Sequence, residues 1–492
     1  MNYLNNTDLK DIEILPKSDF PPKSIAKDKV VNDVSSLIKN LNLENNSVVS
    51  FHHHLRNGDY VLNLVMKEIQ NQGIKGITLV ASSLFPVHKD MIPLLEDGTI
   101  ENIVTSYITG DLAKAISNGK LKGYIMMQSH GGRARSILNE EIEIDAAFIA
   151  SPSVDKTGNI SGVNGENSCG VLGYAMADSI KASKVIAVTD SLVEYPNYPT
   201  DISEDYVDKV LVIDSIGLKE GIVSGTTRVT RDPIGLKIAK DTLKAMEATG
   251  LLKDGMSFQS GAGGTSLAVT SYLREYMIEK DIKGSFASGG ITGYLTNMLE
   301  EGLFSNLYDV QCFDLDAIES LKENPNHLRM SASQYGNPEV SAVVDNLDIV
   351  ILGATEIDVD FNVNVTTGAD GVLMGGSGGH QDTAAGSKVS IIVSQLLSSR
   401  IPFIKDKVDV ITTPGTTVDI LVTERGICVN PLREDLIKLF EEAGLNIVDI
   451  HQLKEYAESI MGKPREIKKG ERIIGLSEYR DGSIIDYIYE VK

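Results

Sequence analysis

Short, continuous apolar runs alternate with amphipathic helical patterns along almost the whole chain, and this alternation limits the folds open to it. Strands that are apolar on both faces must be buried on both faces, which parallel sheets covered by helices provide. The sequence therefore predicts an α/β fold with mostly parallel sheets. The predicted strands are Val48–Phe51, Ile77–Val80, Tyr124–Met127, Ala146–Ala150, Val185–Val188, Lys209–Ile213, Met256–Phe258, Val310–Phe313, Asp348–Leu352, Val389–Val393, Val408–Thr412 and Asp419–Val422.

A pattern of strand, loop, helix and strand occurs once in each half of the chain. Ser50-Phe51 leads into a polar loop, Ser257-Phe258 leads into a glycine loop, and each loop is followed by a helix with apolar residues at i, i+3, i+4 and i+7 spacing. These residues are Leu62, Val65, Met66 and Ile69 in the first half and Val269, Tyr272, Leu273 and Tyr276 in the second. Identical residues are few, so the repetition indicates a shared topology.

The length of the chain predicts more than one domain. Its 492 residues exceed what one hydrophobic core usually supports. Asp232 before Pro233 is typical of a helix N-cap followed by its first residue, so a helix is expected to open the second half there. We expect a polar N-terminal arm (1–45), a first domain (46–231) and a second domain (232–492).

The charge balance excludes some functions. With 46 Lys and Arg against 68 Asp and Glu, the formal net charge is −22. Nucleic-acid binding needs a basic face, so it is not expected. An anionic substrate would need locally cationic pockets. No apolar run approaches the roughly 18 residues of a membrane span, and the N-terminus lacks a signal-peptide core, so a cytoplasmic location without a membrane partner is expected.

Three cysteines, Cys169, Cys312 and Cys428, lie far apart in the sequence. Their odd number and spacing fit a reducing compartment and argue against a disulfide framework or a zinc site, and no bound metal is expected. Cys169 is interpreted as a small packed residue rather than a nucleophile. Hydrolysis by a Ser/His/Asp triad is not expected.

Two glycine loops are the first candidates for chemistry. Gly261-Ala262-Gly263-Gly264 lies between a strand and a helix, and Gly375-Gly376-Ser377-Gly378-Gly379 precedes His380. Glycine lets a ligand approach the backbone, where successive N–H groups can stabilise an oxyanion. The alternative is that both loops are turns that only pack tightly. Neither loop fits the dinucleotide or phosphate-loop motif.

Histidine and arginine clusters are the candidates for binding an anion. His52-His53-His54 follows a strand, so His52 and His54 should share one face and His53 the other, with Arg56 nearby. No carboxylate or cysteine has the spacing of a zinc site, so the cluster is interpreted as a carboxylate receptor.

Further arginines occur in loops with hydroxyl groups or glycines. They are Arg133 after Gly131-Gly132 and Arg228 after Thr227. Such loops are suited to a polycarboxylate, although each arginine could equally form a surface ion pair.

At the level of long motifs the chain resembles the citrate lyase alpha subunit family. The resemblance extends from about Ser50 to Pro464, with the same segments in the same order. These segments are FHHHLRNGDYVLNLVM, SHGGRARSI, SCGVLGYA, SGTTRVTRDPIGL, FQSGAGGTSLAV, DVQCFDLDAI, ATEIDVDFNVNV, GGSGGHQDTAAG and VTERGICVNP.

The resemblance implies two CoA-transferase-like domains that face each other across an active-site cleft. It also implies a citrate CoA-transferase reaction, in which acetyl-S-carrier and citrate give citryl-S-carrier and acetate. The implied partners are the beta subunit and the acyl-carrier (gamma) subunit of citrate lyase, and the small molecules are citrate and acetate. No tightly bound cofactor is implied, because the carrier brings its own CoA-like phosphopantetheine arm, for which acetyl-CoA could substitute.

Residue types and loop positions suggest roles for the candidate residues in this reaction. Those expected to stabilise the oxyanion through their backbone are Gly263, Gly264, Gly376 and Gly378. Those expected to bind the carrier arm or its thioester are Gln259, Gly261, Gly375, Gly379 and His380. Those expected to bind citrate are His52, His53, His54, Arg56, Arg133, Thr227 and Arg228.

One departure from the wider CoA-transferase group bears on mechanism. Many members of that group carry a nucleophilic glutamate where this chain has Gly284–Gly290, and no carboxylate occurs from Lys283 to Gly293. Citrate's own carboxylate could instead attack the acetyl thioester and give a mixed anhydride. Glu356 follows an apolar strand and is interpreted as a structural or positioning residue rather than a nucleophile.

Two other functions stay open at this point. One is a CoA-transferase or thioesterase that acts on free acyl-CoA. The other is a non-catalytic scaffold for the remaining lyase subunits, against which the two glycine loops argue.

Overall fold

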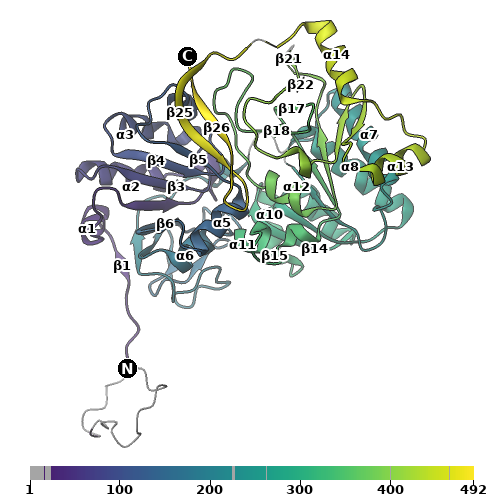
Figure 1. Ribbon diagram of the computed structural model, residues 1–492. Helices are drawn as coiled ribbons and strands as arrows, with labels where there is room; N and C mark the ends of the chain where they lie inside the picture. Colours follow the sequence, from purple (N-terminus) through teal and green to yellow (C-terminus); the bar gives the residue numbers. More distant parts are fainter. Residues whose placement is uncertain (1–15, 17–23, 224–227, 262, 399–400, 465) are drawn as a thin grey trace, which may run out of the picture.

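The computed structural model describes residues 16, 24–223, 228–261, 263–398, 401–464 and 466–492. Two large sheets with helices packed around them make up most of the molecule (Figure 1). All neighbouring strands within each sheet run parallel except the last pair at one edge. The predicted α/β fold with mostly parallel sheets is confirmed.

The first sheet has ten strands. In spatial order they are β1 (Val30–Val31), β11 (Lys209–Val212), β9 (Val185–Thr189), β6 (Ala146–Ala150), β2 (Val48–Phe51), β3 (Ile77–Ala81), β4 (Ile100–Thr105), β5 (Ile125–Met127), β25 (Lys469–Glu478) and β26 (Ile484–Val491). Its helices are α1 (Val34–Asn40), α2 (Val61–Asn71), α3 (Ile92–Glu96), α4 (Asp111–Ser117), α5 (His130–Leu138) and α6 (Ala175–Lys181).

The second sheet has eight strands. In spatial order they are β15 (His327–Arg329), β14 (Phe304–Cys312), β13 (Gly284–Ile291), β12 (Ser257–Ser260), β16 (Ile349–Leu352), β19 (Val389–Val393), β23 (Ile420–Thr423) and β24 (Gly426–Val429). Its helices are α7 (Pro233–Ala248), α8 (Gly264–Lys280), α9 (Gly293–Glu300), α10 (Leu315–Glu323), α11 (Ala332–Gly336), α12 (His380–Gly386), α13 (Glu434–Glu442) and α14 (Ile450–Met461).

Three small sheets and five short 3₁₀ helices complete the described part. The sheets are β10 (Leu192–Val193), β7 (Ser153–Asp155) and β8 (Ile160–Ser161); β18 (Val363–Asn364), β17 (Glu356–Asp358) and β22 (Ile404–Lys405); and β20 (Leu397–Ser398) with β21 (Ile401–Pro402). The 3₁₀ helices are η3 (Arg56–Gly58), η4 (Pro86–Met91), η5 (Lys219–Ile222), η6 (Val343–Asn346) and η7 (Gly415–Thr417).

The repeated pattern predicted from the two halves has the expected topology. β2, α2 and β3 form one parallel unit, and β12, α8 and β13 form the other. The four apolar residues predicted on one face of α2 are all buried. α7 begins at Pro233, and the Asp232 side chain accepts a hydrogen bond from the Gly235 N–H, as an N-cap does.

The sheet order adds two features to the predicted division of the chain. At the N-terminus, β1 pairs with β11, so the end of the predicted arm is part of the first sheet. At the C-terminus, β25 pairs in parallel with β5, so the last two strands return from the second half to the first sheet. Figure 1 shows this hairpin, in yellow, beside β5.

One predicted strand is wrong. Residues 408–412 form no strand, although Val408 and Val410 are buried. Polar contacts hold this segment instead, because the Asp409 N–H donates to Glu356 and the Ile411 N–H donates to Asp486. The alternation of apolar residues here reflects burial of the segment but not hydrogen bonding to a neighbouring strand.

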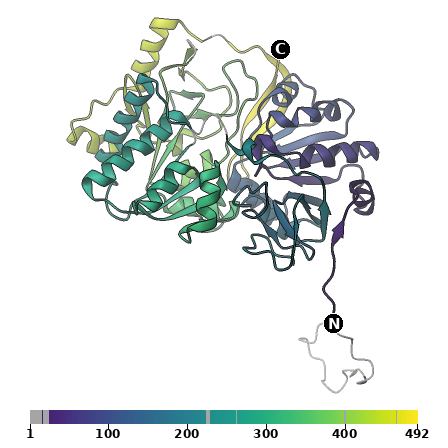
Figure 2. The ribbon, with the colours of Figure 1, turned by 180° about the vertical axis from the view of Figure 1, so that it is seen from behind.

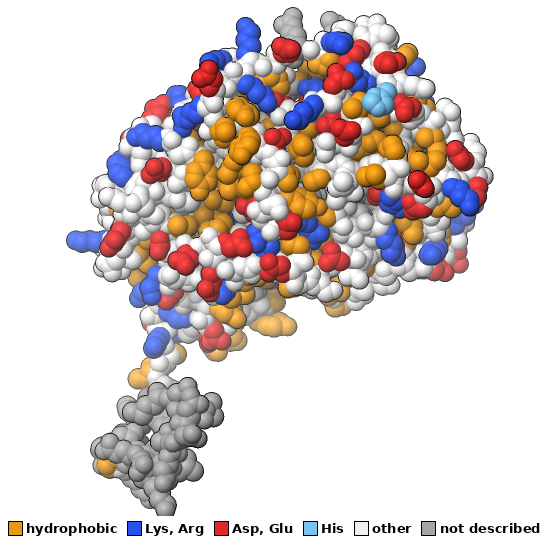
Figure 3. All heavy atoms as spheres, in the orientation of Figure 1, with side chains coloured by type: hydrophobic (Ala, Val, Ile, Leu, Met, Phe, Trp, Pro, Cys, Tyr) orange, Lys and Arg blue, Asp and Glu red, His pale blue; other side chains and the backbone are white. Residues whose placement is uncertain are grey.

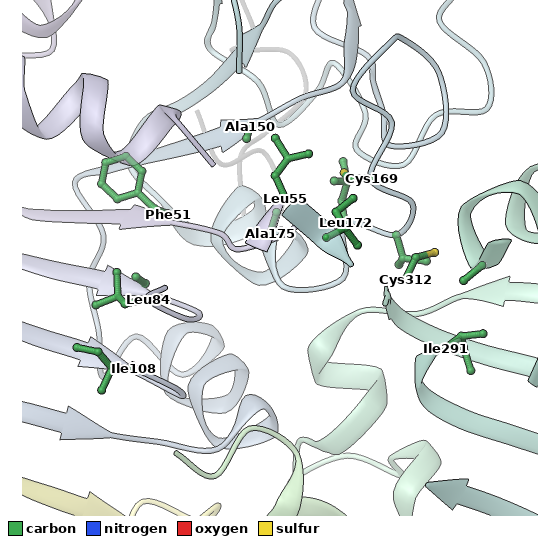
Figure 4. Close-up of a cluster of buried hydrophobic side chains, with 14 of the residues drawn as sticks. Phe51, Leu55, Leu84, Ile108, Ala150, Cys169, Leu172, Ala175, Ile291 and Cys312 are labelled. Atoms are coloured by element: carbon green, nitrogen blue, oxygen red, sulfur yellow. The ribbon is translucent and has the colours of Figure 1, made fainter. Parts of the chain in front are cut away.

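Hydrophobic packing continues from one half into the other. Phe51 and Leu55 from the first half and Ile291 and Cys312 from the second belong to one buried cluster. The close-up shows Cys169 and Leu172 on the side that faces Cys312 (Figure 4). This packing sets the carboxyl ends of the two sheets against each other. Seen from behind, the two halves lie side by side (Figure 2).

The surface seen in Figure 3 mixes both signs of charge, in keeping with an acidic chain that carries many basic residues. Hydrophobic side chains gather near the C-terminal hairpin, where Ile473, Ile484 and Tyr487 are exposed. Within the described ranges, no helix is long and apolar enough to cross a membrane.

Candidate active site

A cavity of about 300 Å³ lies where the carboxyl ends of the two sheets meet. Ligand sites of α/β proteins form at this end of the strands. Both halves of the chain contribute its lining. The lining residues are His53, Arg56, Ser83, Phe85, Tyr107, His130 and Tyr174 from the first half and Gln259, Ser260, Gly261, Gly290, Val310, Gln311, Phe313, Tyr335, Leu352, Gly353, Gly376, Ser377, Gly378, Gly379 and His380 from the second.

The three consecutive histidines divide between two environments, as the alternation of a strand predicts. His53 lines the cavity, and its Nδ1 lies 2.6 Å from the Ser82 hydroxyl oxygen. His52 and His54 are absent from the cavity lining, and their rings stack with centroids 5.8 Å apart. Of the three, only His53 is therefore placed to contact a ligand in this cavity.

A buried carboxylate, Asp178 on α6, lies behind the histidine turn. It accepts two hydrogen bonds from Arg133, of 2.9 and 2.7 Å, and His52 Nε2 lies 3.2 Å away. Burial by itself would raise the pKa of Asp178, but the charges of Arg133 and His52 outweigh it and hold that pKa well below its ordinary value. Arg133, predicted to bind citrate, is thus occupied by an internal ion pair away from the cavity.

Arg56 is the cationic side chain of the cavity. Its guanidinium lies 5.4 Å from the ring centre of Phe85 and 4.8 Å from that of Phe313, so one aromatic residue from each half flanks it. Nε and Nη1 are buried and have no hydrogen-bond partner among the described residues. Burial lowers the pKa of Arg56, although an arginine remains cationic at neutral pH. A buried cation with unused donors is suited to receive a carboxylate.

Aromatic side chains of the first half form another part of the lining. The Tyr174 ring lies 4.6 Å from that of His53 and 4.4 Å from that of His130, between ring centres. Burial lowers the pKa of His130 to about 3, with a smaller contribution from the charge of Arg133. Burial also lowers the pKa of His53 well below its ordinary value. Both imidazoles are neutral at pH 7, so Arg56 supplies the charge.

The glycine loop 375–379 connects the two halves at the cavity. The Gly375 carbonyl accepts a hydrogen bond from the Ile108 N–H, and the Gly378 carbonyl accepts one from the His130 N–H. The Gly378 N–H donates to the Ser106 carbonyl, 3.1 Å away. Gly378 was predicted to stabilise an oxyanion, but its donor is occupied in this way, which leaves Gly376, Ser377 and Gly379 as the loop's candidates.

Close packing explains why this loop needs glycine. A Cβ atom on Gly376 would lie 2.3 Å from the Ser106 carbonyl oxygen, and one on Gly379 would lie 2.1 Å from the Tyr335 hydroxyl oxygen. Side chains at these positions would push the loop away from its neighbours. The loop is therefore tightly packed, as the alternative interpretation of the glycines predicted, and it also lines the cavity.

The other glycine loop reaches the cavity only in part. Gln259, Ser260 and Gly261 line it, but the Gly261 N–H donates to the Ile351 carbonyl, and Gln259 is held by Tyr335 and Ser288. Gly263 and Gly264 stand at the start of α8 and are not among the lining residues.

Three other predicted residues lie apart from the cavity or outside the described part. Arg228 is exposed, and its carbonyl lies beside Gly264 at the start of α8. Thr227 is outside the described residues. Glu356 belongs to the small sheet of β17, where it pairs with Lys405 and accepts a hydrogen bond from Asn364, so its contacts are structural. His380 does line the cavity, with Nδ1 2.7 Å from the Thr413 hydroxyl and Nε2 3.0 Å from the Gly353 carbonyl.

The described lining contains no carboxylate and no thiol. Gly290 occupies the end of β13, and a Cβ atom there would lie 2.2 Å from the Phe313 ring. The ring thus fills the space that a side chain at Gly290 would need. Burial raises the pKa of all three cysteine thiols, which makes them poor nucleophiles. Across the described ranges, no cluster of three or more His, Cys, Asp or Glu side chains could hold a metal ion.

Comparisons with known proteins identify the family. A sequence model described as "Citrate lyase, alpha subunit (CitF)" matches residues 27–491. The citrate lyase alpha chain of Klebsiella pneumoniae is 43% identical over 94% of this chain and 92% of that relative. This chain belongs to the citrate lyase alpha subunit family. The Escherichia coli K12 alpha chain is 42% identical, covering 99% of this chain and 95% of the relative.

A solved structure of the family has the same fold. The alpha subunit of citrate lyase from Streptococcus mutans, determined in complex with citrate, superposes with a TM-score of 0.93 at 44% identity, over 96% of this chain and 93% of that one. The alpha subunit of a malonate decarboxylase from Acinetobacter baumannii has a TM-score of 0.68 at 15% identity, over 89% of this chain and 94% of that one, and shows a shared fold. The designation alpha implies a subunit of a larger complex.

Several cavity residues of this citrate lyase alpha subunit family member escaped the sequence analysis. Ser83, Phe85 and Tyr107 follow strands, Tyr174 precedes α6 and Tyr335 lies within α11. None of the five stands in a histidine, arginine or glycine cluster. His130 and Phe313 lie inside family motifs but were not chosen as candidates. His130 follows the predicted strand Tyr124–Met127 and Phe313 ends the predicted strand Val310–Phe313. These positions were the available signal, because strand ends collect site residues.

Proposed function

We propose that this chain exchanges acetyl for citryl on an acyl-carrier subunit. Acetyl-S-carrier and citrate react to give citryl-S-carrier and acetate. Membership of the citrate lyase alpha subunit family over residues 27–491 is the observation that carries this proposal. The citrate in the related Streptococcus mutans structure and the cationic cavity of this chain are consistent with it.

Arg56 is the proposed anchor for a citrate carboxylate. Arg56 is buried, has unused hydrogen-bond donors and lines the cavity. Neither of the other predicted arginines combines these three properties in the described structure. Low dielectric strengthens the attraction between a guanidinium and a carboxylate. His53 is neutral and lies on the same wall, where it could donate or accept one hydrogen bond. His52, His54 and Arg133 support this wall from behind.

The second substrate is proposed to be the acetyl thioester on the carrier's phosphopantetheine arm, with no resident cofactor. The backbone N–H groups of Gly376, Ser377 and Gly379 are the proposed donors to the thioester oxygen as it gains negative charge. Gln259, Gly261, Gly375 and His380 shape the wall along which the end of the arm would lie. The carrier and the beta subunit are the proposed partners, and the cytoplasm is the proposed location.

The reaction can proceed without an enzyme nucleophile. A citrate carboxylate oxygen attacks the acetyl carbon, the carbon–sulfur bond breaks, and the carrier leaves as a thiolate. The thiolate then attacks the citryl carbonyl of the mixed anhydride, and acetate leaves. The protein contributes by holding both substrates together and by stabilising the oxyanion. The absence of carboxylates and thiols from the described lining supports this route.

The test is an exchange assay with the full-length chain. Acetylated carrier and citrate should yield acetate and citryl carrier in equal amounts. Rapid release of acetate without citrate would indicate a thioesterase. Equal activity with free acetyl-CoA would indicate a CoA-transferase of broader use, and no activity with an intact carrier would indicate a scaffold.

A further inference from the structure

The tip of the C-terminal hairpin lies behind the cavity, where it contacts both halves of the chain. Arg480, at this tip, is only 6% exposed. Its Nη2 donates to the Gly336 carbonyl at 2.9 Å, and its Nε lies 3.7 Å from an oxygen of Asp382. Gly336 ends α11, and Asp382 lies in the first turn of α12.

Asp382 links the hairpin tip to the first half. Its carboxylate accepts hydrogen bonds from the Ser129 hydroxyl, at 2.7 Å, and from the Gly131 N–H, at 2.9 Å. Ser129 is the N-cap of α5, whose first residue is His130. Arg480 is therefore connected through one carboxylate to the start of the helix that places His130 in the cavity.

A second contact connects the tip to the other cavity histidine. Gln381 follows His380 at the start of α12, and its side-chain amide donates to the carbonyl of Glu478 in the hairpin. The Glu478 carboxylate in turn accepts from Gln128, two residues before His130. The hairpin tip thus contacts the segments that carry both His130 and His380.

We propose that Arg480 is a positioning residue for the transfer reaction: through Asp382 it holds the starts of α5 and α12 together, so that His130 and the Gly375–Gly379 loop meet at the cavity. The direct bond from the His130 N–H to the Gly378 carbonyl lies at this junction. Arg480 itself is absent from the cavity lining in the described structure. This inference rests on the proposed function for its kinetic readout only.

A matched control lies on the same hairpin. Arg472 in β25 also donates to backbone carbonyls, those of Gly119 and Lys122, at 3.0 and 2.8 Å. These carbonyls belong to the first half, away from α5 and α12. Arg472→Met should therefore reproduce the loss of a hairpin arginine without disturbing the junction.

The experiment compares Arg480→Met, Arg480→Lys and Arg472→Met in the full-length chain. Arg480→Met should lower kcat for the exchange by between about tenfold and a hundredfold with little change in the KM for citrate, since small misplacements of catalytic groups cost rate. Arg480→Lys, which keeps the charge, should recover part of the lost kcat. It replaces Arg480→Met in the comparison if the methionine variant does not fold. Arg472→Met should retain the kcat of the unaltered chain.

A pH profile separates positioning from general destabilisation. Burial raises the pKa of Asp382 to about 6, and the charge of Arg480 opposes that rise. Without Arg480 the carboxylate should stay protonated to higher pH. The acid limb of the kcat–pH profile should therefore shift to higher pH in Arg480→Met alone. The other titratable groups that influence or are influenced by Asp382 are Asp345 on η6, Tyr335 on α11, Tyr174 before α6 and Tyr479 in the hairpin.

Amide hydrogen exchange tests the junction without any activity assay. A peptide covering residues 129–138 should exchange faster in Arg480→Met than in Arg472→Met, because Asp382, which accepts a hydrogen bond from the Gly131 N–H, is no longer held by Arg480. Equal exchange in the two variants, or a kcat for Arg480→Met within twofold of the unaltered chain, would overturn the proposal. Should the unaltered chain lack exchange activity, the proposed function fails and hydrogen exchange still decides the role of Arg480.

Discussion

Single residues at the cavity owe their chemistry to what surrounds them. Arg56 and Arg133 have the same side chain, yet Arg133 is neutralised by Asp178 and Arg56 faces the cavity with unused donors. Three neighbouring histidines likewise separate into one cavity residue and a stacked pair behind it. Residue type alone therefore could not say which of these groups meets a substrate.

Replacement of Arg56 by methionine should weaken citrate use. A hydrogen bond to a charged group contributes about 1.5–3 kcal/mol, so kcat/KM for citrate should fall by roughly 10- to 150-fold. Arg274→Met is the control, because Arg274 is a surface residue paired with Glu301. Steady-state kinetics with varied citrate measure the effect. An unchanged citrate dependence in Arg56→Met would remove it as the anchor.

A buried histidine should make folding stability depend on pH. Burial lowers the pKa of His380 to about 4, so the folded chain binds fewer protons than the unfolded chain between that value and the ordinary one of about 6.5. Its contribution is present above pH 6.5 and is lost as the pH falls toward 4. At pH 5 the loss amounts to about 2 kcal/mol relative to pH 8.

His380→Gln should reduce this pH dependence. Denaturant unfolding of both proteins at pH 5 and pH 8 provides the measurement, and the difference between the two pH values should be smaller in the variant. Asp382, with its raised pKa, changes stability in the opposite direction over this range but is present in both proteins. Equal pH dependence in the two would contradict a neutral buried His380.

At the scale of elements, the two glycine loops differ in how closely they are packed. Gly376→Ala should destabilise the chain by about 1–3 kcal/mol and abolish most exchange activity, because its Cβ would press on the Ser106 carbonyl. Gly263→Ala should lower the unfolding midpoint less, since a Cβ there meets its first neighbour at 3.8 Å and only the preference for glycine over alanine at the N-cap of α8 is lost. Thermal unfolding and the exchange assay compare them. Equal stability of the two variants would show that the loop relaxes without cost.

On the scale of the whole molecule, the cavity exists only where the two halves meet. Its described lining supplies a cation, neutral imidazoles, hydroxyls and backbone groups, with no carboxylate or thiol. This composition predicts a reaction in which both substrates are bound before either product leaves, since the described lining has no carboxylate or thiol to hold an acyl group between two half-reactions.

Intact-mass measurement during turnover should show no acyl or thioester adduct on the chain. Initial-rate kinetics should require citrate and acetylated carrier together, without ping-pong exchange. Glu356→Gln should retain transfer activity, in keeping with its contacts to Lys405 and Asn364. An adduct on any residue, together with ping-pong kinetics, would refute the direct-anhydride route.

Local patterns in the sequence determined the layered α/β fold, most of the central strands, the start of α7 at Asp232-Pro233 and the separation of His53 from its neighbours. Each of these depends on residues close in the chain: apolar runs, capping residues and alternation along a strand. Family motifs pointed to the citrate lyase alpha subunit for the same reason, because they are contiguous segments.

Tertiary structure decided what depends on distant residues. It brought β25 and β26 back to the first sheet, paired Arg133 with Asp178 and placed Phe313 against Gly290. It also left Arg56 as the cavity cation and set Arg480 against Asp382. These contacts join residues tens to hundreds of positions apart, and their energies come from burial and pairing, which no local spacing records.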